Sequence, residues 1–500
     1  MNRMVQVYLF RMIKKLLLRK EQQHELQQGD SAPSPPTLAH VLQEFEQCSD
    51  LKHRFFPDIH IDVLYFDHMV SGEDVGREIL QPLRSLSVQE VSAYMRRSPF
   101  KRIDEAKRLI KGILDGQTAL FWKDQAYLAD TNGPQFRSVQ QSETETVITG
   151  PHDSFIENIQ TNLSLIRSRI KSSHLKVIPC EVGEITKTTV YILFIQDIAN
   201  RELVHKLVRR IESVEMDGLT DTNMLIQYID EHPNSVFPQF LTTERPDAAV
   251  SRLLSGRIVG IVDGSPSAFS APTNFFEFFS SPDDYYQRWM LGTALRFLRF
   301  LAFIITVTFT AFYVSVTTYH YEMIPAALLT NLAESRYRVP FPPIYEALLM
   351  EITIELLREA GARLPTKIGQ TIGIVGGIVI GQAAVQAGLT SNVLIIAVAS
   401  SAIASFVIPS YVMSASIRLI RFGLIVLAGM WGNMGLMFGV AYIVIHLSGL
   451  SNLGVSYLSP LAPMNVSDWK DVFIRAPYWL MRKRSTSVKS PNPTRNRMKQ

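Results

Sequence analysis

The stretch FLAFIITVTFTAFYVSVTTY, residues 300–319, contains no ionised side chain. A helix rises about 1.5 Å per residue, so about twenty residues are needed to cross a hydrocarbon layer roughly 30 Å thick. This run therefore predicts a transmembrane helix. Its composition decides the class of the protein, because a soluble chain rarely carries so long a run without a charge.

Similar apolar runs recur toward the C-terminus. Residues 368–417 also lack ionised side chains, and the sequence GLTSN at 388–392 divides this run in two. A further apolar run follows at residues 422–447. The sequence therefore predicts four membrane spans, at about 300–319, 368–388, 393–413 and 422–447.

The first 299 residues instead alternate charged and apolar positions, as soluble proteins do. Segments with a period of two, such as IHIDVLYF at 59–66, predict strands, and apolar residues three or four positions apart predict helices. In the first half we expect strands at 59–66 and 118–127 and helices at 75–80, 88–95 and 103–114. In the second half we expect strands at 175–182, 189–195, 236–242 and 257–262 and helices at 155–170, 202–211, 222–229 and 247–254.

These elements predict an α/β cytoplasmic region of two small mixed-sheet domains, followed by an α-helical, polytopic membrane domain. The two α/β domains are residues 55–143 and 144–289, and the membrane domain covers residues 290–480. An amphipathic helix at about 342–360 separates the first two spans. Residues 1–54 hold a basic N-terminal helix and a proline-rich linker, and residues 481–500 form a basic cytoplasmic tail.

Charge and motif content argue against several functions. The formal net charge of +4 is modest for 500 residues, so nucleic-acid binding is not indicated. The two cysteines, Cys48 and Cys180, lie far apart without metal-ligand spacing, and we expect neither a disulfide framework nor a zinc site. No Walker or dinucleotide fingerprint occurs in the α/β domains. We therefore expect no cofactor and no enzymatic activity.

Basic residues near the spans predict the orientation. Three arginines precede the first span, and seven Lys or Arg residues follow from Arg482 onward, in both cases without an acid. Both termini should therefore be cytoplasmic. Arg418 and Arg421 would then lie outside, between the third and fourth spans. If the helix at 342–360 also crossed the membrane, that pair would lie inside, and the tail would need a further partial crossing near 450–463.

The amphipathic helix carries Glu351, Glu355 and Glu359 at positions i, i+4 and i+8. This spacing places three carboxylates on one helical face. Repeated around an axis, the face would form a ring of carboxylates that concentrates cations. Pairing with nearby basic residues is an equal alternative, and the available partners are Arg358, Arg363, Lys367, Arg418 and Arg421.

The second predicted span carries glycines four residues apart, Gly369, Gly373, Gly377 and Gly381. Such a ladder favours close helix packing, and a narrow pore wall or gating hinge is the alternative. The uncharged amides at membrane depth either bond between helices or line a pore; they are Gln370, Gln382, Gln386 and Asn433.

Several longer phrases resemble the A subunits of GerA family spore germination receptors. They are PQFLTTERPD (238–247), GRIVGIVDGSP (256–266), NFFEFFSSPDDYYQRW (274–289), MEITIELLREAGARLP (350–365), IGQAAVQAGLTSN (380–392) and YLSPLAP (457–463). The resemblance covers most of the chain from about Phe155 to Pro463 and is specific in combination.

The resemblance implies a place in the inner membrane of a bacterial spore, beside a transporter-like B subunit and a lipoprotein C subunit. It also implies that nutrient recognition belongs chiefly to the B subunit, and that A subunits form an oligomeric, ion-conducting channel, expected to be a pentamer. A non-conducting sensory or scaffolding subunit is the alternative function. A membrane enzyme would need a nucleophile, base or metal cluster at membrane depth, and the sequence offers none.

Overall fold

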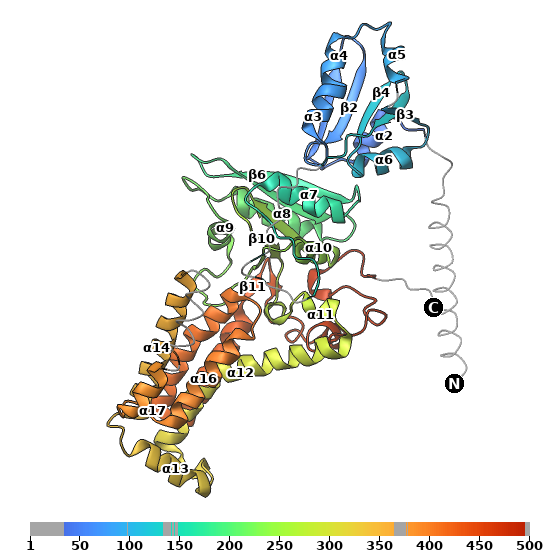
Figure 1. Cartoon of the computed structure of the whole chain (residues 1–500). Helices are drawn as coiled ribbons and strands as arrows, with labels where there is room; N and C mark the ends of the chain where they lie inside the picture. Colours follow the sequence, from blue (N-terminus) through green and yellow to red (C-terminus); the bar gives the residue numbers. More distant parts are fainter. Residues whose placement is uncertain are drawn as a thin grey trace, which may run out of the picture. The chain divides into compact units, whose positions relative to one another are not determined.

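The computed structural model describes residues 35–97, 99–133, 142, 145, 149–364, 377 and 379–495. The chain forms two compact units, the first from residues 1–136 with 170–173 and the second from the remainder. The basic helix expected within residues 1–20 lies outside the described residues, as do Gln370 and Gly373. Figure 1 shows the elements of both units.

The first unit is a five-stranded sheet between two layers of helices. Its strand order is β1-β2-β4-β5-β3. The strands are β1 (Leu51–Phe56), β2 (Ile61–Phe66), β3 (Phe100–Ile103), β4 (Thr118–Trp122) and β5 (Gln125–Ala129). The helices are α2 (Leu38–Glu44), α3 (Gly72–Asp74), η1 (Val75–Leu80), α4 (Gln81–Ser85), α5 (Val91–Met95) and α6 (Ala106–Leu114).

Period-two alternation builds this sheet, as the sequence predicted for β2. Val63 and Tyr65 pack on the face covered by η1, α4 and α5, whereas Leu64 and Phe66 pack against α2 and α6. The register places Leu120 of β4 opposite Val63 of β2. Both faces of the sheet are therefore buried.

The second unit begins with another five-stranded sheet, in the order β6-β7-β9-β10-β8. The strands are β6 (Leu175–Val182), β7 (Thr188–Ile195), β8 (Leu241–Thr243), β9 (Ile258–Val262) and β10 (Ala268–Ala271). The helices that cover the sheet are α7 (Ile159–Arg169), α8 (Arg201–Glu212), α9 (Thr222–Ile229) and α10 (Pro246–Leu254).

Both sheets are antiparallel at every strand pair, so the prediction of mixed sheets is wrong. The alternation of strands and helices misled the prediction because the helices connect strands that are not neighbours. Helices α8 and α9 lead from β7 to the far edge strand β8, and α10 leads back to β9 in the middle. Three strands were also missed, β1, β3 and β10, and the strand expected at 236–242 is confined to Leu241–Thr243.

The rest of the second unit is largely helical. After η2 (Phe275–Phe279) and α11 (Asp283–Tyr286) come α12 (Trp289–Tyr319), η3 (Tyr321–Met323), α13 (Ala326–Arg336), α14 (Pro343–Arg363), a helical segment at 379–386, α16 (Asn392–Phe406) and α17 (Tyr411–Gly449). The C-terminal segment holds β11 (Ser451–Asn452), β12 (Val455–Ser456), η4 (Val466–Asp471) and η5 (Thr486–Val488).

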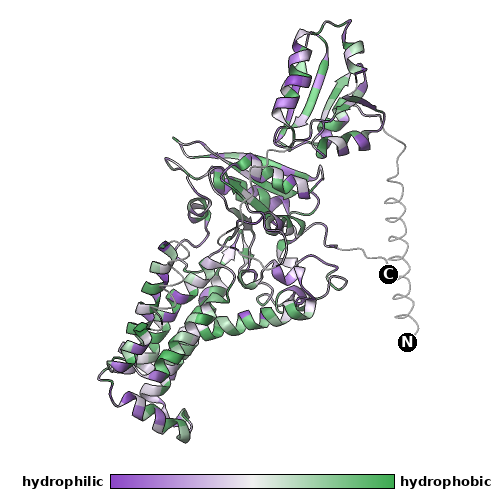
Figure 2. Ribbon diagram, viewed as in Figure 1, coloured by the Kyte–Doolittle hydropathy of each residue, from purple (hydrophilic) through white to green (hydrophobic). Residues whose placement is uncertain are grey.

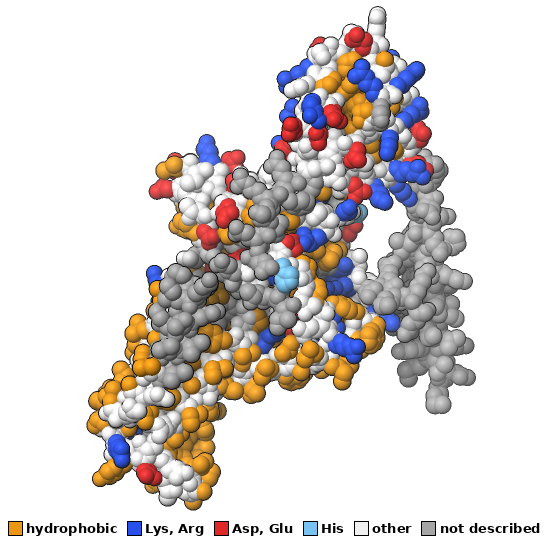
Figure 3. Space-filling model, in the orientation of Figure 1, with side chains coloured by type: hydrophobic (Ala, Val, Ile, Leu, Met, Phe, Trp, Pro, Cys, Tyr) orange, Lys and Arg blue, Asp and Glu red, His pale blue; other side chains and the backbone are white. Residues whose placement is uncertain are grey.

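Apolar side chains dominate this helical region. Among the described residues, α12 and α17 are long and apolar enough to cross a membrane, and α16 is a shorter apolar helix. Figure 2 shows the same helices as mostly hydrophobic. In Figure 3, hydrophobic side chains gather on the visible face of the helical region, whereas charged side chains gather over the α/β sheets.

Helix α17 consists of two helices folded back on each other. Trp431 and Gly432 have non-helical dihedrals, and Gly432 has a φ of +59°. Beyond this turn, a Cβ atom on Gly439 would lie 2.3 Å from the side chain of Leu424, so the two halves pack closely. The spans expected at 393–413 and 422–447 are therefore wrong in their ends, because α16 stops at Phe406 and α17 begins at Tyr411. Hydropathy could not place the turn, because the residues around it are apolar.

Contacts between helices show which ends lie together. At one end, Tyr319 at the end of α12 donates hydrogen bonds to the carbonyls of Gly429 and Met430, beside the α17 turn. At the other end, His446 of α17 bonds Ser235, 2.9 Å away, next to the second sheet. Both the start of α12 and the end of α17 therefore lie near that sheet.

Candidate functional site

The acidic helix predicted at about 342–360 is α14, and its Glu351 points into the helical bundle. Proline at its first helical position and Pro342 as its N-cap explain where the helix begins. Glu351 lies 2.6 Å from the guanidinium of Arg421 on α17, and both side chains are fully buried. Thr310 of α12 donates a hydrogen bond of 2.8 Å to the same carboxylate. Three helices therefore meet at one buried carboxylate.

Glu355, one turn further along, also pairs within the chain. It accepts a hydrogen bond of 2.8 Å from Arg418, and Arg358 lies 3.5 Å from its other oxygen. Serines of α16 complete the arrangement, because Ser401 accepts from Arg421 at 2.8 Å and Ser405 accepts from Arg358 at 2.9 Å. We call this set the bundle cluster: Thr310, Glu351, Glu355, Arg358, Ser401, Ser405, Arg418 and Arg421.

Glu359 differs from the other two carboxylates. It pairs with Arg363 at 2.6 Å, and both side chains are largely exposed. The three glutamates do share one helix, but their surroundings grade from fully buried at Glu351 to 33% exposed at Glu355 and 56% exposed at Glu359. A buried ion pair is costly to break, because removing one partner strands the other charge. The bundle cluster therefore ties α12, α14, α16 and α17 together.

Arg418 and Arg421 do not lie in a loop between spans, as the four-span prediction placed them. Both lie inside α17 and are buried in the bundle. The sequence had offered them as partners of the acidic helix, and that pairing is what the structure contains. The serines of α16 were missed, although Ser401 and Ser405 stand at i, i+4 in an otherwise apolar run, a spacing that could have indicated them.

Two glycines of the ladder, Gly377 and Gly381, belong to the described residues, and both have open space beside them. A Cβ atom added to Gly377 or Gly381 would meet no heavy atom within 4 Å beyond its own helix. Gln382 is exposed in this single chain. Gly377 and Gly381 therefore face a cavity that α14 and α16 also line, whereas the side chain of Gln382, which does not line that cavity, is exposed elsewhere.

Asn433 lies at the α17 turn, and not within a straight span as expected. Its Oδ1 accepts a hydrogen bond of 2.7 Å from Ser315 of α12, and its Nδ2 lies 3.3 Å from the sulfur of Met323. The amide therefore fastens the turn to the end of α12.

A second buried ion-pair cluster lies where α12 begins. The carboxylate of Asp284 is fully buried, 2.7 Å from Arg299 and 3.1 Å from Arg296. Arg296 also lies 3.3 Å from Asp471 in the C-terminal segment. In the sequence, these arginines served only to predict the orientation of the first span. In the structure, their ion pairs also join α11, α12 and η4.

Two carboxyl groups beside the second sheet have unusual acidities. Burial raises the pKa of Glu145 to about 7, although a hydrogen bond from Thr243 opposes the shift. Burial also raises the pKa of Asp230 to about 7, against the attraction of Arg210. The neighbouring Glu231 accepts hydrogen bonds from Lys206, Arg210 and Ser451. In the described part of the chain, no group of three His, Cys, Asp or Glu residues could hold a metal ion.

Comparisons with known proteins place the chain in a family. The family model described as Bacillus/Clostridium GerA spore germination protein matches residues 39–487. The chain is 41% identical to spore germination protein GerQA of Bacillus cereus over 430 residues, which is 85% of this chain and 86% of that protein. It is 33% identical to the uncharacterized membrane protein YfkQ of Bacillus subtilis (strain 168) over 476 residues, 92% of this chain and 93% of that protein.

Among solved structures, the crystal structure of the N-terminal domain of the A subunit of the Bacillus megaterium spore germinant receptor GerK3 matches with a TM-score of 0.38 and 21% identity. That match covers 49% of this chain and 99% of the other. The chain belongs to the GerA family of spore germination proteins.

Proposed function

We propose that this chain is the A-type membrane subunit of a nutrient-responsive spore germination receptor, and that several copies form a gated cation channel. The observation that carries the proposal is the face of the helical segment at 379–386. The side chain of Gln382 is exposed there, although it belongs to a long run without a charge. An amide at membrane depth faces protein or water, because hydrocarbon cannot satisfy its hydrogen bonds.

The proposed topology is multi-pass, with both termini in the cytoplasm. The passes are α12, α14, the segment that ends near Gly388, α16, and the two halves of α17. Glu346, near the start of α14, accepts a hydrogen bond of 3.2 Å from the backbone of Ser391, whereas Arg358, near its end, bonds Ser405 at the other end of α16. This direction supports α14 as a crossing, and an even number of passes returns the basic tail to the side of the sheets.

The candidates for the pore-lining role are then Gln370, Gly373, Gly377 and Gln382, although Gly377 and Gln382 are five residues apart and lie on different sides of the helix. Glu351 and Glu355 are assigned to holding the bundle, because each has a basic partner within the chain. Glu359 remains a candidate for a ring at the cytoplasmic mouth, since its side chain is exposed. Asn433 is assigned to the α17 turn.

The proposed setting is the inner spore membrane, where the chain forms a homo-pentamer beside a transporter-like B subunit and a lipoprotein C subunit. Membership of the GerA family supports the receptor role. A non-conducting scaffold is the second candidate function, and one feature of the bundle cluster favours it. Internal pairing neutralises the carboxylates that would otherwise concentrate cations.

The decisive experiment reconstitutes the receptor in liposomes and measures ion flux with and without nutrient. We expect nutrient-dependent ion flux. Gln382→Ala should reduce this flux, or allow flux without nutrient, at unchanged protein abundance. Ile445→Ala is the matched control, because that side chain is also exposed on a membrane helix but carries no polar group. Absence of flux from an intact, nutrient-binding receptor would favour the scaffold.

The bundle cluster is tested separately. Glu351→Gln leaves Arg421 without its carboxylate, so we expect low abundance of the folded protein and no change in ion selectivity. Altered selectivity at normal abundance would return Glu351 to the pore.

A further inference from the structure

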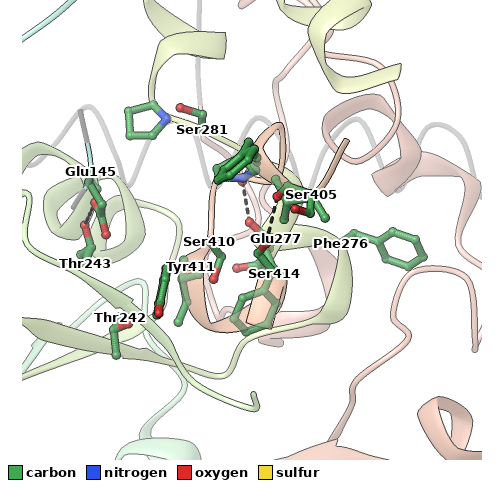
Figure 4. Close-up of a pocket in the computed structure, with 18 of the residues that line it drawn as sticks. Glu145, Thr242, Thr243, Phe276, Glu277, Ser281, Ser405, Ser410, Tyr411 and Ser414 are labelled. Atoms are coloured by element: carbon green, nitrogen blue, oxygen red, sulfur yellow. Dashed lines mark hydrogen bonds between the residues drawn. The ribbon is translucent and has the colours of Figure 1, made fainter. Parts of the chain in front are cut away.

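A large cavity lies between the second sheet, the helical bundle and the C-terminal segment, all within the second unit. Its volume is about 2040 Å³, roughly twice the upper end of the 300–1,000 Å³ range typical of pockets for drug-sized ligands. Figure 4 shows one part of it, which is lined by Thr242 and Thr243 of β8 and by Ser410, Tyr411 and Ser414 of the bundle. The cavity therefore has room for a long ligand.

One wall of the cavity is apolar and belongs to the bundle. Helix α14 contributes Ile354 and Leu357, and α16 contributes Ile395, Val398 and Phe406. Ile354, Leu357 and Phe406 lie on the halves of α14 and α16 that approach the second sheet. Ile395 and Val398 lie nearer the start of α16, so they extend the apolar wall away from the sheet. The wall continues from the sheet end into the membrane region proposed above.

The opposite wall carries a surplus of positive charge. Lys470, Arg482, Lys483 and Arg484 all line the cavity, and none of the four has a salt bridge to a described carboxylate. Burial, followed by repulsion from Arg495, lowers the pKa of Arg484. The acids on the lining already have hydrogen-bonding partners; they are Glu145, Asp247, Glu277, Asp468 and Asp471. This wall therefore offers positive charge to an anion.

The segment beside the basic wall has the composition of a membrane-interface anchor. Tyr478, Trp479 and Leu480 are each about half exposed, and Arg482 and Lys483 follow directly. Aromatic residues next to basic ones are enriched where the headgroups of a bilayer meet its hydrocarbon. The basic wall is therefore placed at headgroup depth, and the apolar wall at the depth of acyl chains.

We propose that this cavity binds an anionic phospholipid. The phosphate lies against Lys470, Lys483 and Arg484, and the acyl chains lie along α14 and α16. A ligand with one anionic end and one long apolar end matches both walls, and the membrane supplies it at high local concentration. Such a lipid would also join the C-terminal segment to the helices of the bundle cluster. The inference rests on the membrane placement in the proposed function, but not on ion conduction.

The test titrates purified full-length protein in detergent with phosphatidylglycerol and with phosphatidylcholine, and counts bound lipid by native mass spectrometry. We expect selective binding of phosphatidylglycerol. The double variant Lys470→Gln, Lys483→Gln removes two charges without removing a side-chain hydrogen bond, and it should bind about 30-fold more weakly, because each basic residue near an anionic surface contributes about 1 kcal/mol. Lys489→Gln is the control, since Lys489 is exposed in the same segment but does not line the cavity.

Other outcomes overturn the proposal. Equal weakening by Lys489→Gln would mean a non-specific charge effect. Competition by inorganic phosphate, or equally tight binding of glycerol phosphate without acyl chains, would mean a simple anion site. A cysteine at Leu357 that cross-links to a second copy of the chain would mean that protein fills the cavity. Protein that fails to enter membranes at all would instead contradict the membrane placement.

Discussion

The two α/β sheets have the same topology but different surroundings. Numbered within each sheet, both have the strand order 1-2-4-5-3, and both are antiparallel throughout. Each bound of α10 and β9 equals the corresponding bound of α6 and β4 plus 140 residues. In both sheets a glycine with positive φ follows that helix, Gly116 at +85° and Gly256 at +91°. We infer that the two domains are repeats of one unit.

The difference lies in what each repeat buries. Glu105 precedes α6 and pairs with Arg108 on the surface, where both side chains are largely exposed. The equivalent Arg245 precedes α10, is 2% exposed, and pairs with the buried Asp247. The second repeat also continues into η2, whose phenylalanines pack against α12 and the C-terminal segment. One fold thus serves once as a solvated domain and once as a platform for the helical region.

The largest expected effect comes from the buried member of the matched pair. Arg245→Met leaves Asp247 buried without its guanidinium, and we expect a loss of about 3–5 kcal/mol in the second repeat. Hydrogen exchange of the full-length protein, read at α10, measures this locally. The double variant Arg245→Met, Asp247→Asn should recover much of the loss. Unchanged protection in the single variant would mean that the buried ion pair between Arg245 and Asp247 does not stabilise the second repeat.

Substitution of either shared glycine should destabilise its repeat. Gly116→Ala and Gly256→Ala each force a side chain into the left-handed region, which costs roughly 1–2 kcal/mol. The loss should be greater at Gly116, where the new Cβ would lie 2.7 Å from the carbonyl oxygen of Met69, than at Gly256, where the nearest atoms are 3.3 Å away. Hydrogen exchange at β4 and β9 compares the two. A neutral effect at either glycine would break the equivalence of the repeats.

The second repeat should also depend on pH through Asp230. Its folded-state pKa of about 7 lies above its ordinary value of 3.8, so the folded state holds the proton more tightly. This stabilisation is fully present below the ordinary pKa and is lost as the pH rises through about 7. Allowing for partial exposure, Asp230→Asn should relieve about 1–2 kcal/mol above that pH. Pulse proteolysis one pH unit below and above this pKa is the measurement, and Glu90→Gln is the control in the first repeat.

The smallest effect is expected at the exposed member of the matched pair. Glu105→Gln removes one exposed salt bridge with Arg108, so the first repeat should lose less than about 1 kcal/mol. Hydrogen exchange at α6, measured beside the Arg245 variant, checks it. A loss as large as that at α10 would mean that the first repeat is buried against something in the full-length protein.

Local patterns predicted the elements better than their connections. Apolar and β-branched segments located β2, β6 and β7, because such residues fit the buried, pleated surface of a sheet. The short edge strands β1 and β3 were missed, since exposed edges carry charged residues such as Lys52 and Arg54 that hide the alternation. Strand direction and the repeat were missed because both depend on non-local pairing.

The candidate site was likewise predicted from local patterns but not from contacts between distant parts of the chain. Spacing along one helix predicted the row of Glu351, Glu355 and Glu359, and nearby charges suggested their basic partners. The sequence left pore and pairing equal, because only the fold of α17 brings Arg418 and Arg421 to α14. The second sheet's acidic groups were not predicted, since the pKa of Asp230 depends on burial that comes from packing.

The turn at Trp431 and Gly432 has a consequence for how the protein is made. Helix α17 spans 39 residues, and within it this turn is the break in helical geometry. To an insertion apparatus that reads hydropathy as the chain emerges, the segment offers no polar loop at which to stop between its halves. With the proposed multi-pass topology, we therefore expect the two halves to enter the bilayer together as a preformed pair, with Gly435 and Gly439 allowing their backbones to meet before either contacts α12.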